Sequence, residues 1–256
     1  MALYYQEFGV GEPIVILHGL FGSSDNWISI AKVFSETYRV ILPDIPHHGR
    51  SSHEPELTYP NIAKVIFEWL QELNLEKIDI IGHSMGGKIA MQLAQSYQDF
   101  ISTLVIVDIA PKVYNNRHEE ILNALSDLDL SRYQNRSEVD AALRDKLPDT
   151  PIRQFLLKSL DVSQPDLTWR FNLNMITTRY AEIANVPTFI SPWDGPALFI
   201  KGAESDYIQS TDAELINKWF PQADIVSIPH TDHWVHAQNP NAVLSAIQTF
   251  YAAQQE

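Results

Sequence analysis

The chain has 256 residues, a formal net charge of −14 and no cysteine, and it is 45% hydrophobic and 20% charged. This composition is typical of a globular protein with a large core. The acidic balance argues against a nucleic-acid partner, because phosphate binding requires a basic surface. The lack of cysteine excludes a disulfide scaffold, a thiolate nucleophile and a cysteine metal site, and it fits a reducing cytoplasm.

Neither a membrane span nor a signal peptide is visible. No stretch approaches the roughly 20 apolar residues that cross a bilayer. The segment Met1–Glu7 lacks a basic region followed by a long apolar run. We therefore expect a cytoplasmic protein without stable membrane insertion. The sequence carries no signal for the oligomeric state.

Short apolar runs recur along the chain and predict strands. Most end at Gly, Pro or Asp, as is typical of strands buried on both faces of a parallel sheet. The expected strands are an edge strand Leu3–Phe8, then Ile14–Leu17, Tyr38–Leu42, Ile78–Ile81, Leu104–Val107, Ala197–Lys201 and Asp224–Ile228.

Helical patterns alternate with these strands. Asn61–Leu73 has apolar residues at i, i+3, i+4 and i+7, and a second helix is expected over Met85–Tyr97. Asn239 followed by Pro240 predicts the N-cap and first residue of a helix that runs through Phe250. The alternation predicts an α/β fold with a doubly wound, mostly parallel sheet.

The alternation stops in the middle of the chain, where only helical patterns occur. The expected helices are Arg117–Leu130, Ser137–Lys146, Thr150–Leu160 and Leu173–Ala184. We predict a core domain built from residues 1–110 and 196–256, interrupted by a helical cap over residues 111–195.

Residues 82–87 read Gly-His-Ser-Met-Gly-Gly and match the pattern G-x-S-x-G between a predicted strand and a predicted helix. This is the context of a nucleophile elbow, in which a serine sits at a tight strand-to-helix turn. Side chains two residues either side of the serine would collide there, so both positions are glycine. The pattern predicts Ser84 as a nucleophile.

A serine nucleophile requires a base, and four histidines are candidates. His230, His233 and His236 follow the last predicted strand, and His83 adjoins Ser84. We favour His233 because the loop from Pro229 gives it room to reach Ser84. We assign His236 a structural role near the last helix and His83 a supporting role in the elbow.

Several segments together resemble the α/β-hydrolase superfamily, and more narrowly the bacterial YbfF-type acyl esterases. The segments are His18–Ser23, Asp44–Ser51, Gly82–Gly87, Val107–Pro111, Gly202–Tyr207 and His233–Pro240. They extend from the second strand to the last helix, whereas the cap contributes little to the resemblance.

The resemblance also bears on the acid that orients the base. Many relatives carry it three residues beyond a glycine after a late strand, but that position is Ser205 here, with Asp206 offset by one. Asp108 ends the preceding core strand, an alternative location in the superfamily. We therefore expect Asp108 as the acid, with Asp206 as the alternative and Ser205 as an auxiliary hydrogen-bonding member.

The resemblance further implies an oxyanion hole and apolar walls around the nucleophile. We expect backbone N–H groups of Leu20 and Met85 to bind the oxyanion, with Phe21 a weaker alternative to Leu20. We expect the side chains of Phe21 and Trp234 to contact substrate. No metal or organic cofactor is implied.

Two other constellations have simpler explanations. Asp44, His47 and His48 supply too few ligands for a metal cage. Residues 111–195 hold 10 of the 18 basic residues, which would attract anionic acyl-CoA thioesters, but ordinary solvated helix faces with acidic neighbours explain these charges better.

We predict a serine hydrolase that cleaves small carboxylic esters or acyl thioesters through an acyl-enzyme on Ser84, with acyl-CoA among the candidate substrates. One alternative uses the same triad for perhydrolysis or C–C bond hydrolysis, because function belongs to the site and not the fold. Another is a ligand-binding protein without catalysis, which lost triad residues would favour.

Overall fold

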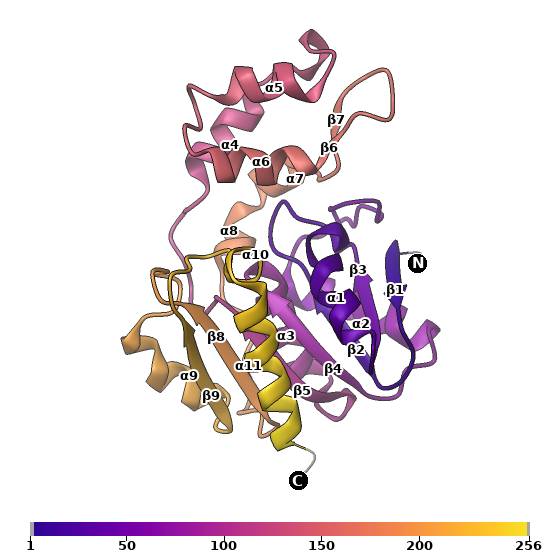
Figure 1. Ribbon diagram of the computed structural model, residues 1–256, viewed down its shortest axis with the longest axis vertical. Coiled ribbons are helices and arrows are strands. Elements are labelled where there is room, and N and C mark those ends of the chain that lie inside the picture. The colour runs from indigo at the N-terminus through magenta and orange to yellow at the C-terminus, as the bar shows by residue number, and fades with distance from the viewer. Residues whose placement is uncertain (1–2, 255–256) are drawn as a thin grey trace.

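A seven-stranded sheet organises the protein in the order β1-β3-β2-β4-β5-β8-β9. The computed structural model describes residues 3–254 (Figure 1). The strands are β1 (Tyr5–Phe8), β2 (Pro13–Leu17), β3 (Arg39–Pro43), β4 (Ile78–His83), β5 (Ile101–Val107), β8 (Ala197–Gly202) and β9 (Ala223–Ile228). Only β1 pairs antiparallel, at one edge, and the other pairings are parallel. The expected α/β class with a mostly parallel sheet is confirmed.

Helices cover both faces of this sheet. Outside residues 117–185, the α-helices are α1 (Ile28–Phe34), α2 (Tyr59–Glu72), α3 (Met85–Ser96), α9 (Ala213–Trp219), α10 (Val235–Gln238) and α11 (Pro240–Ala253). The short 3-10 turns there are η1 (Ser24–Trp27), η2 (Gln98–Phe100) and η4 (Ser210–Asp212). Helices α2, α3 and α9 contribute to one buried cluster, and α1 and α11 contribute to the other. Sequence patterns predicted α2, α3 and α11 but not α1 or α9.

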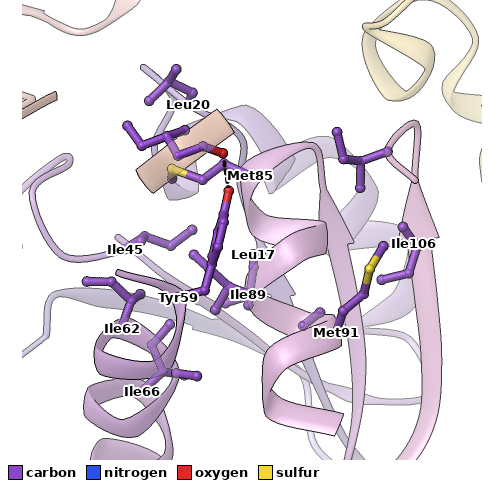
Figure 2. Close-up of a cluster of buried hydrophobic side chains, with 14 of the residues drawn as sticks. Leu17, Leu20, Ile45, Tyr59, Ile62, Ile66, Met85, Ile89, Met91 and Ile106 are labelled. Atoms are coloured by element: carbon purple, nitrogen blue, oxygen red, sulfur yellow. Dashed lines mark hydrogen bonds between the residues drawn. The ribbon is translucent and has the colours of Figure 1, made fainter. Parts of the chain in front are cut away.

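Strand β2 shows why the sheet has a core on each side. Val15 and Leu17 belong to the cluster on the α2–α3 side, and Ile14 and Ile16 belong to the opposite cluster. Because successive side chains of a strand point to opposite faces, a continuous apolar run contributes buried side chains to the cores on both sides of the sheet. Each such side chain contributes about 1.5–3 kcal/mol on full burial. Figure 2 shows Leu17 in the first cluster, near Ile89 of α3.

Between β5 and β8 the chain leaves the sheet and forms the helices at the top of Figure 1. These elements are α4 (Glu119–Ser126), η3 (Leu130–Arg132), α5 (Arg136–Leu143), α6 (Thr150–Lys158), the two-stranded pair β6 (Leu160–Asp161) and β7 (Thr168–Trp169), α7 (Leu173–Thr178) and α8 (Tyr180–Ala184). We refer to residues 117–185, which contain these elements, as the cap segment.

Two expectations about the cap segment require correction. The helix predicted over Leu173–Ala184 is broken at Arg179 into α7 and α8. The hydroxyl of Thr178 donates to the carbonyl of Asn174 at 2.8 Å, and such local bonds compete with the helical ladder. The β6–β7 pair was not predicted, because two-residue strands carry no periodic pattern. The terminal residues 1–2 and 255–256 of the predicted core domain lie outside the described residues.

Candidate active site

Ser84 occupies the turn between β4 and α3 with φ 52° and ψ −118°. This backbone conformation is strained for a residue with a side chain, and it is kept by close packing around the turn. A Cβ on Gly82 would lie 2.4 Å from the carbonyl oxygen of Gly86, and a Cβ on Gly86 would lie 2.4 Å from that of Leu17. The two glycines of the motif are therefore required sterically, as the sequence predicted.

Three side chains from separate loops form a chain of hydrogen bonds. The Oγ of Ser84 lies 3.0 Å from Nε2 of His233, and Nδ1 of His233 lies 2.9 Å from Oδ2 of Asp108. A buried carboxylate on Nδ1 fixes the imidazole tautomer that leaves Nε2 free to accept the serine proton. The arrangement can therefore activate a serine for attack on a carbonyl group.

The structure distinguishes the two candidate acids. Asp108 is completely buried and also accepts a hydrogen bond from the backbone N–H of Gly202 at 3.0 Å. Asp206 instead forms a bidentate ion pair with Arg117 at 2.6 and 3.0 Å. That pairing holds the pKa of Asp206 below its usual range. Of the two, only Asp108 is placed against His233.

Ser205 and Tyr207 support this pair from the loop after β8. The Oγ of Ser205 donates to the same Oδ2 of Asp108 that faces His233, and it accepts from the backbone N–H of Tyr207 at 3.2 Å. The ring of Tyr207 stacks on the imidazole of His233 with centroids 3.7 Å apart. Tyr207 was not predicted, because nothing in its local sequence marks it as a stacking partner.

The three other candidate bases, His83, His236 and His230, do not contact Ser84 as a base would. Nε2 of His83 lies 2.9 Å from the backbone carbonyl of His233, and His236 stacks on Trp27 at 4.4 Å. Burial lowers the pKa of His83 well below its usual value and that of His236 to about 3, so both rings are neutral. His230 is fully exposed, with 93% of its side chain accessible. His233 is therefore the histidine that the structure brings to Ser84.

The loop after β2 is held in place by His18. Its Nε2 accepts from the backbone N–H of Ile45 at 3.0 Å, so Nδ1 carries the proton and donates to the carbonyl of Gly19 at 2.8 Å. Burial lowers the pKa of His18, which favours the neutral ring that this pairing requires. The fixed loop places Leu20 beside Ser84 and Met85 in one hollow. Figure 2 shows Leu20 and Met85 together at one end of the buried cluster.

Two hollows meet at Ser84. The lining of the first includes Leu20, Met85, Lys88, Tyr114, His118 and Tyr207. The lining of the second includes Phe21, Phe155, Leu156, His118, His233 and Trp234. Phe21 and Trp234, the predicted substrate contacts, thus lie in the same hollow as His233. Ser84 lines both hollows.

Lys88 lies one helical turn beyond Ser84 and was not predicted as part of the site. Its Nζ donates to the backbone carbonyls of Ala184, at 2.9 Å, and of Asn185, at the end of α8. Burial lowers the pKa of Lys88 to about 7. Tyr59 of α2 donates to the neighbouring carbonyl of Ile183 at 2.6 Å. Helices α2 and α3 therefore anchor the end of the cap segment directly behind the nucleophile.

Two further sequence features were the cluster around Asp44 and the basic residues of the cap. The carboxylate of Asp44 accepts from the backbone N–H groups of Ser24 at 2.7 Å and Arg50 at 2.9 Å. Within residues 3–254, no group of three potential metal ligands comes together. Among the cap cations, Lys146 forms an exposed pair with Asp127 at 2.9 Å, which agrees with the solvated-face interpretation. Arg153 differs, because it is buried and pairs with Asp140 at 3.0 Å.

The described part of the chain holds no helix long and apolar enough to cross a membrane. Residues 12–240 match the family described as alpha/beta hydrolase fold. Esterase YbfF of Escherichia coli is 39% identical over 239 residues, which cover 93% of this chain and 92% of that protein. The sn-1-specific diacylglycerol lipase ABHD11 of Danio rerio is 39% identical over 251 residues, which cover 94% and 79%.

Among solved structures, the protein described as a marine microorganism esterase superposes with a TM-score of 0.94 at 38% identity, covering 97% of this chain and 98% of that one. The resemblance to YbfF-type esterases is thereby confirmed. The family match, the identity over most of the chain and the superposition agree with the observed fold. The chain belongs to the alpha/beta hydrolase fold family.

Proposed function

We propose that this protein is a carboxylic-ester hydrolase that acts through an acyl-enzyme on Ser84. The observation that carries the proposal is the continuous chain of hydrogen bonds from Ser84 through His233 to Asp108 at a strained elbow. Relatives over nearly the whole chain are named esterases and lipases, which supports ester hydrolysis.

The geometry supports the following sequence of steps. Ser84 Oγ attacks the ester carbonyl carbon, and its proton passes to Nε2 of His233. The C–O bond to the leaving group breaks, and the departing oxygen takes that proton. Water then repeats the sequence on the acyl-enzyme and releases the acid. Asp108 holds His233 in the required tautomer throughout.

We assign the oxyanion hole to the backbone N–H groups of Leu20 and Met85. Both residues line the hollow that contains Ser84, and Met85 begins helix α3, whose N-terminal N–H groups have no partner within the helix. Such donors stabilise the negative charge that develops on the carbonyl oxygen. Phe21 and Trp234 form apolar walls of the second hollow, and we assign them to substrate contact.

The proposal includes finer points that stay predictions. Thioesters are a second candidate substrate class, since the same triad attacks both carbonyl types. The division into a core of residues 1–110 and 196–256 with a cap of residues 111–195 is part of the proposal, and so is a cytoplasmic location. Perhydrolysis and C–C bond hydrolysis are less well supported, because the relatives are named for ester cleavage. A non-catalytic role is less well supported because the hydrogen-bonded triad is complete.

The direct test compares wild type with Ser84→Ala on p-nitrophenyl esters from acetate to decanoate. We expect wild-type hydrolysis, and a loss of at least about 10⁴-fold in kcat in the variant, because the nucleophile is removed. Acyl-CoA thioesters of the same chain lengths would show whether the activity extends to them. A folded wild type that cleaves none of these substrates would overturn the proposal.

A further inference from the structure

His118 lies over the active site although no motif includes it. The residue precedes α4 in the cap segment, more than thirty residues along the chain from Ser84. Its side chain lines both hollows, and the only residues that share this position are Leu20 and Ser84. The ring also makes an edge contact with Phe21, with centroids 5.8 Å apart. A substrate that occupies both hollows therefore passes beneath this imidazole.

The hydrogen bonds around His118 determine which nitrogen carries the proton. Nδ1 lies 2.6 Å from the hydroxyl of Tyr180, and that hydroxyl oxygen accepts the backbone N–H of Arg117 at 3.3 Å. Among the contacts of the described residues, Nδ1 is the one acceptor beside the Tyr180 hydroxyl, so we assign the hydroxyl proton to the bond with Nδ1. The imidazole proton is then on Nε2, the nitrogen on the opposite side of the ring from Tyr180.

The ring is also kept neutral. Burial, the neighbouring His233 and Arg117 lower the pKa of His118 to about 4. A neutral ring adds no positive charge beside His233, which becomes an imidazolium during the reaction. His118 can thus offer an N–H group to the site without opposing proton transfer to His233.

We propose that Nε2–H of His118 donates a hydrogen bond to the alkoxy oxygen of the scissile ester and makes the enzyme selective for oxygen esters over thioesters. This inference rests on the proposed function and specifies its substrate class. The carbonyl oxygen is already assigned to the backbone N–H groups of Leu20 and Met85. The alkoxy oxygen is the other polar atom at the bond that spans the two hollows.

The chemistry of the leaving atom gives this contact its selectivity. When the C–O bond breaks, its electron pair stays on oxygen, which takes the proton from Nε2 of His233. A second lone pair of the same oxygen accepts from His118, and this bond strengthens as negative charge develops. Sulfur is a weak hydrogen-bond acceptor, so a thioester gains little from the same donor.

The experiment measures kcat/KM for phenyl butyrate and S-phenyl thiobutyrate, which share the acyl group and differ in the leaving atom. For His118→Phe we expect kcat/KM to fall about 10- to 100-fold on the oxygen ester and less than about threefold on the thioester. His118→Gln retains an N–H donor near the position of Nε2, and we expect it to regain most of the loss. Tyr180→Phe frees the tautomer, and we expect a loss of about threefold on the oxygen ester alone.

Equal losses on both substrates, or no recovery in His118→Gln, would overturn the inference and leave His118 a structural role. If the wild type cleaves only the oxygen ester, the preference is complete and the thioester rates cannot be compared. The recovery of oxygen-ester activity in His118→Gln then tests the role of His118. Ser84→Ala distinguishes a failure of the proposed function from a failure of the role proposed for His118. If Ser84→Ala stays active, the proposed function fails, whereas an inactive Ser84→Ala with an unchanged His118→Phe refutes only the role of His118.

Discussion

The edge of the sheet and the cap segment build the same site in different ways. Ser84 and Asp108 follow directly after the buried strands β4 and β5, and His233 lies on the loop after β9. The cap segment adds His118, just before α4, and Phe155 of α6, and neither belongs to a recognisable motif. The proposed reaction machinery thus follows from backbone geometry at one sheet edge. We propose that selectivity depends on side chains that the cap segment brings to that edge.

The two regions also differ in how they are held. The sheet-edge loops are fixed by neighbouring strands and by backbone hydrogen bonds such as Ser84 N–H to the carbonyl of Val107 at 3.0 Å. The end of the cap segment is fixed by side chains of the core, chiefly Lys88 and Tyr59, which donate to carbonyls at the end of α8. Single substitutions should therefore perturb the two regions separately.

The largest effect is expected from Asp108→Asn, compared with Asp206→Asn as the matched control. An amide at position 108 favours the wrong tautomer of His233, and we expect kcat on a p-nitrophenyl ester to fall by roughly 10³- to 10⁴-fold. Asp206 faces Arg117 of the cap region and not the base, so its variant should stay within about threefold of wild type. The opposite ranking would move the acid to Asp206.

Sequence patterns singled out Ser84, Asp108 and His233, and the structure brings these three side chains together at the sheet edge. The elbow needs glycine two residues either side of Ser84, and the steric clashes at Gly82 and Gly86 account for that requirement. The sequence favoured Asp108 over Asp206 as the acid but could not exclude Asp206. The decision depends on which carboxylate pairs with Arg117, which lies 89 residues from Asp206 along the chain.

The cap segment was predicted only as a set of helices, and the helix over Leu173–Ala184 was wrong. Periodicity does not report the Thr178 hydroxyl, whose bond to the carbonyl of Asn174 favours a bend between α7 and α8. His118, Lys88 and Tyr207 were missed for a shared reason. Each acts through a partner distant in sequence, and single-sequence patterns report only neighbours within a helix or strand.

Lys88→Met tests the anchor of the cap segment. The variant leaves the carbonyl of Asn185 without its cation donor, and we expect the free energy of unfolding to fall by about 1–3 kcal/mol. Lys64→Met, at an exposed position of α2, should change it by less than about 0.5 kcal/mol. Urea denaturation of the three proteins measures both values. Equal stabilities of Lys88→Met and wild type would show that the anchor is dispensable.

The pH dependence of that loss gives a sharper test. Lys88 has a folded pKa of about 7, below its unfolded value of about 10.4, so the folded state releases its proton first as the pH rises. Burial of the charged amine therefore offsets part of the stabilisation by the anchor below pH 7, and this offset disappears as the pH rises toward 10. The deficit of Lys88→Met relative to wild type should be larger at pH 9 than at pH 6. A deficit independent of pH would contradict the low pKa.

Acid sensitivity should arise mainly from the buried histidines of the core. His236 and His47 have folded pKa values of about 3 and 4, whereas the unfolded chain titrates near 6.5. Stability is then lost as the pH falls below 6.5. His236→Gln should weaken this fall by up to about 1.4 kcal/mol per pH unit, and the exposed His230→Gln should not. Denaturation midpoints between pH 7 and 4.5 measure the slopes, and parallel slopes would refute the prediction.

The smallest effect is expected from Ser205→Ala. Its hydroxyl supports Asp108 without touching Ser84, and Gly202 and His233 remain as partners of the carboxylate. We expect kcat to fall by about three- to tenfold, which corresponds to about 1 kcal/mol, the net contribution of a typical hydrogen bond. A loss as large as that of Asp108→Asn would make Ser205 an essential member of the site.

The central claim is that Ser84 is the nucleophile activated at the sheet edge. The most direct measurement is the intact mass of the protein after incubation with a p-nitrophenyl alkylphosphonate, which phosphonylates activated serines. We expect one adduct, which peptide mapping locates on the segment that contains Ser84. Esterase activity should fall in proportion to labelling, and Ser84→Ala should carry no adduct. Esterase activity that survives complete labelling, or an adduct on a different serine, would contradict it.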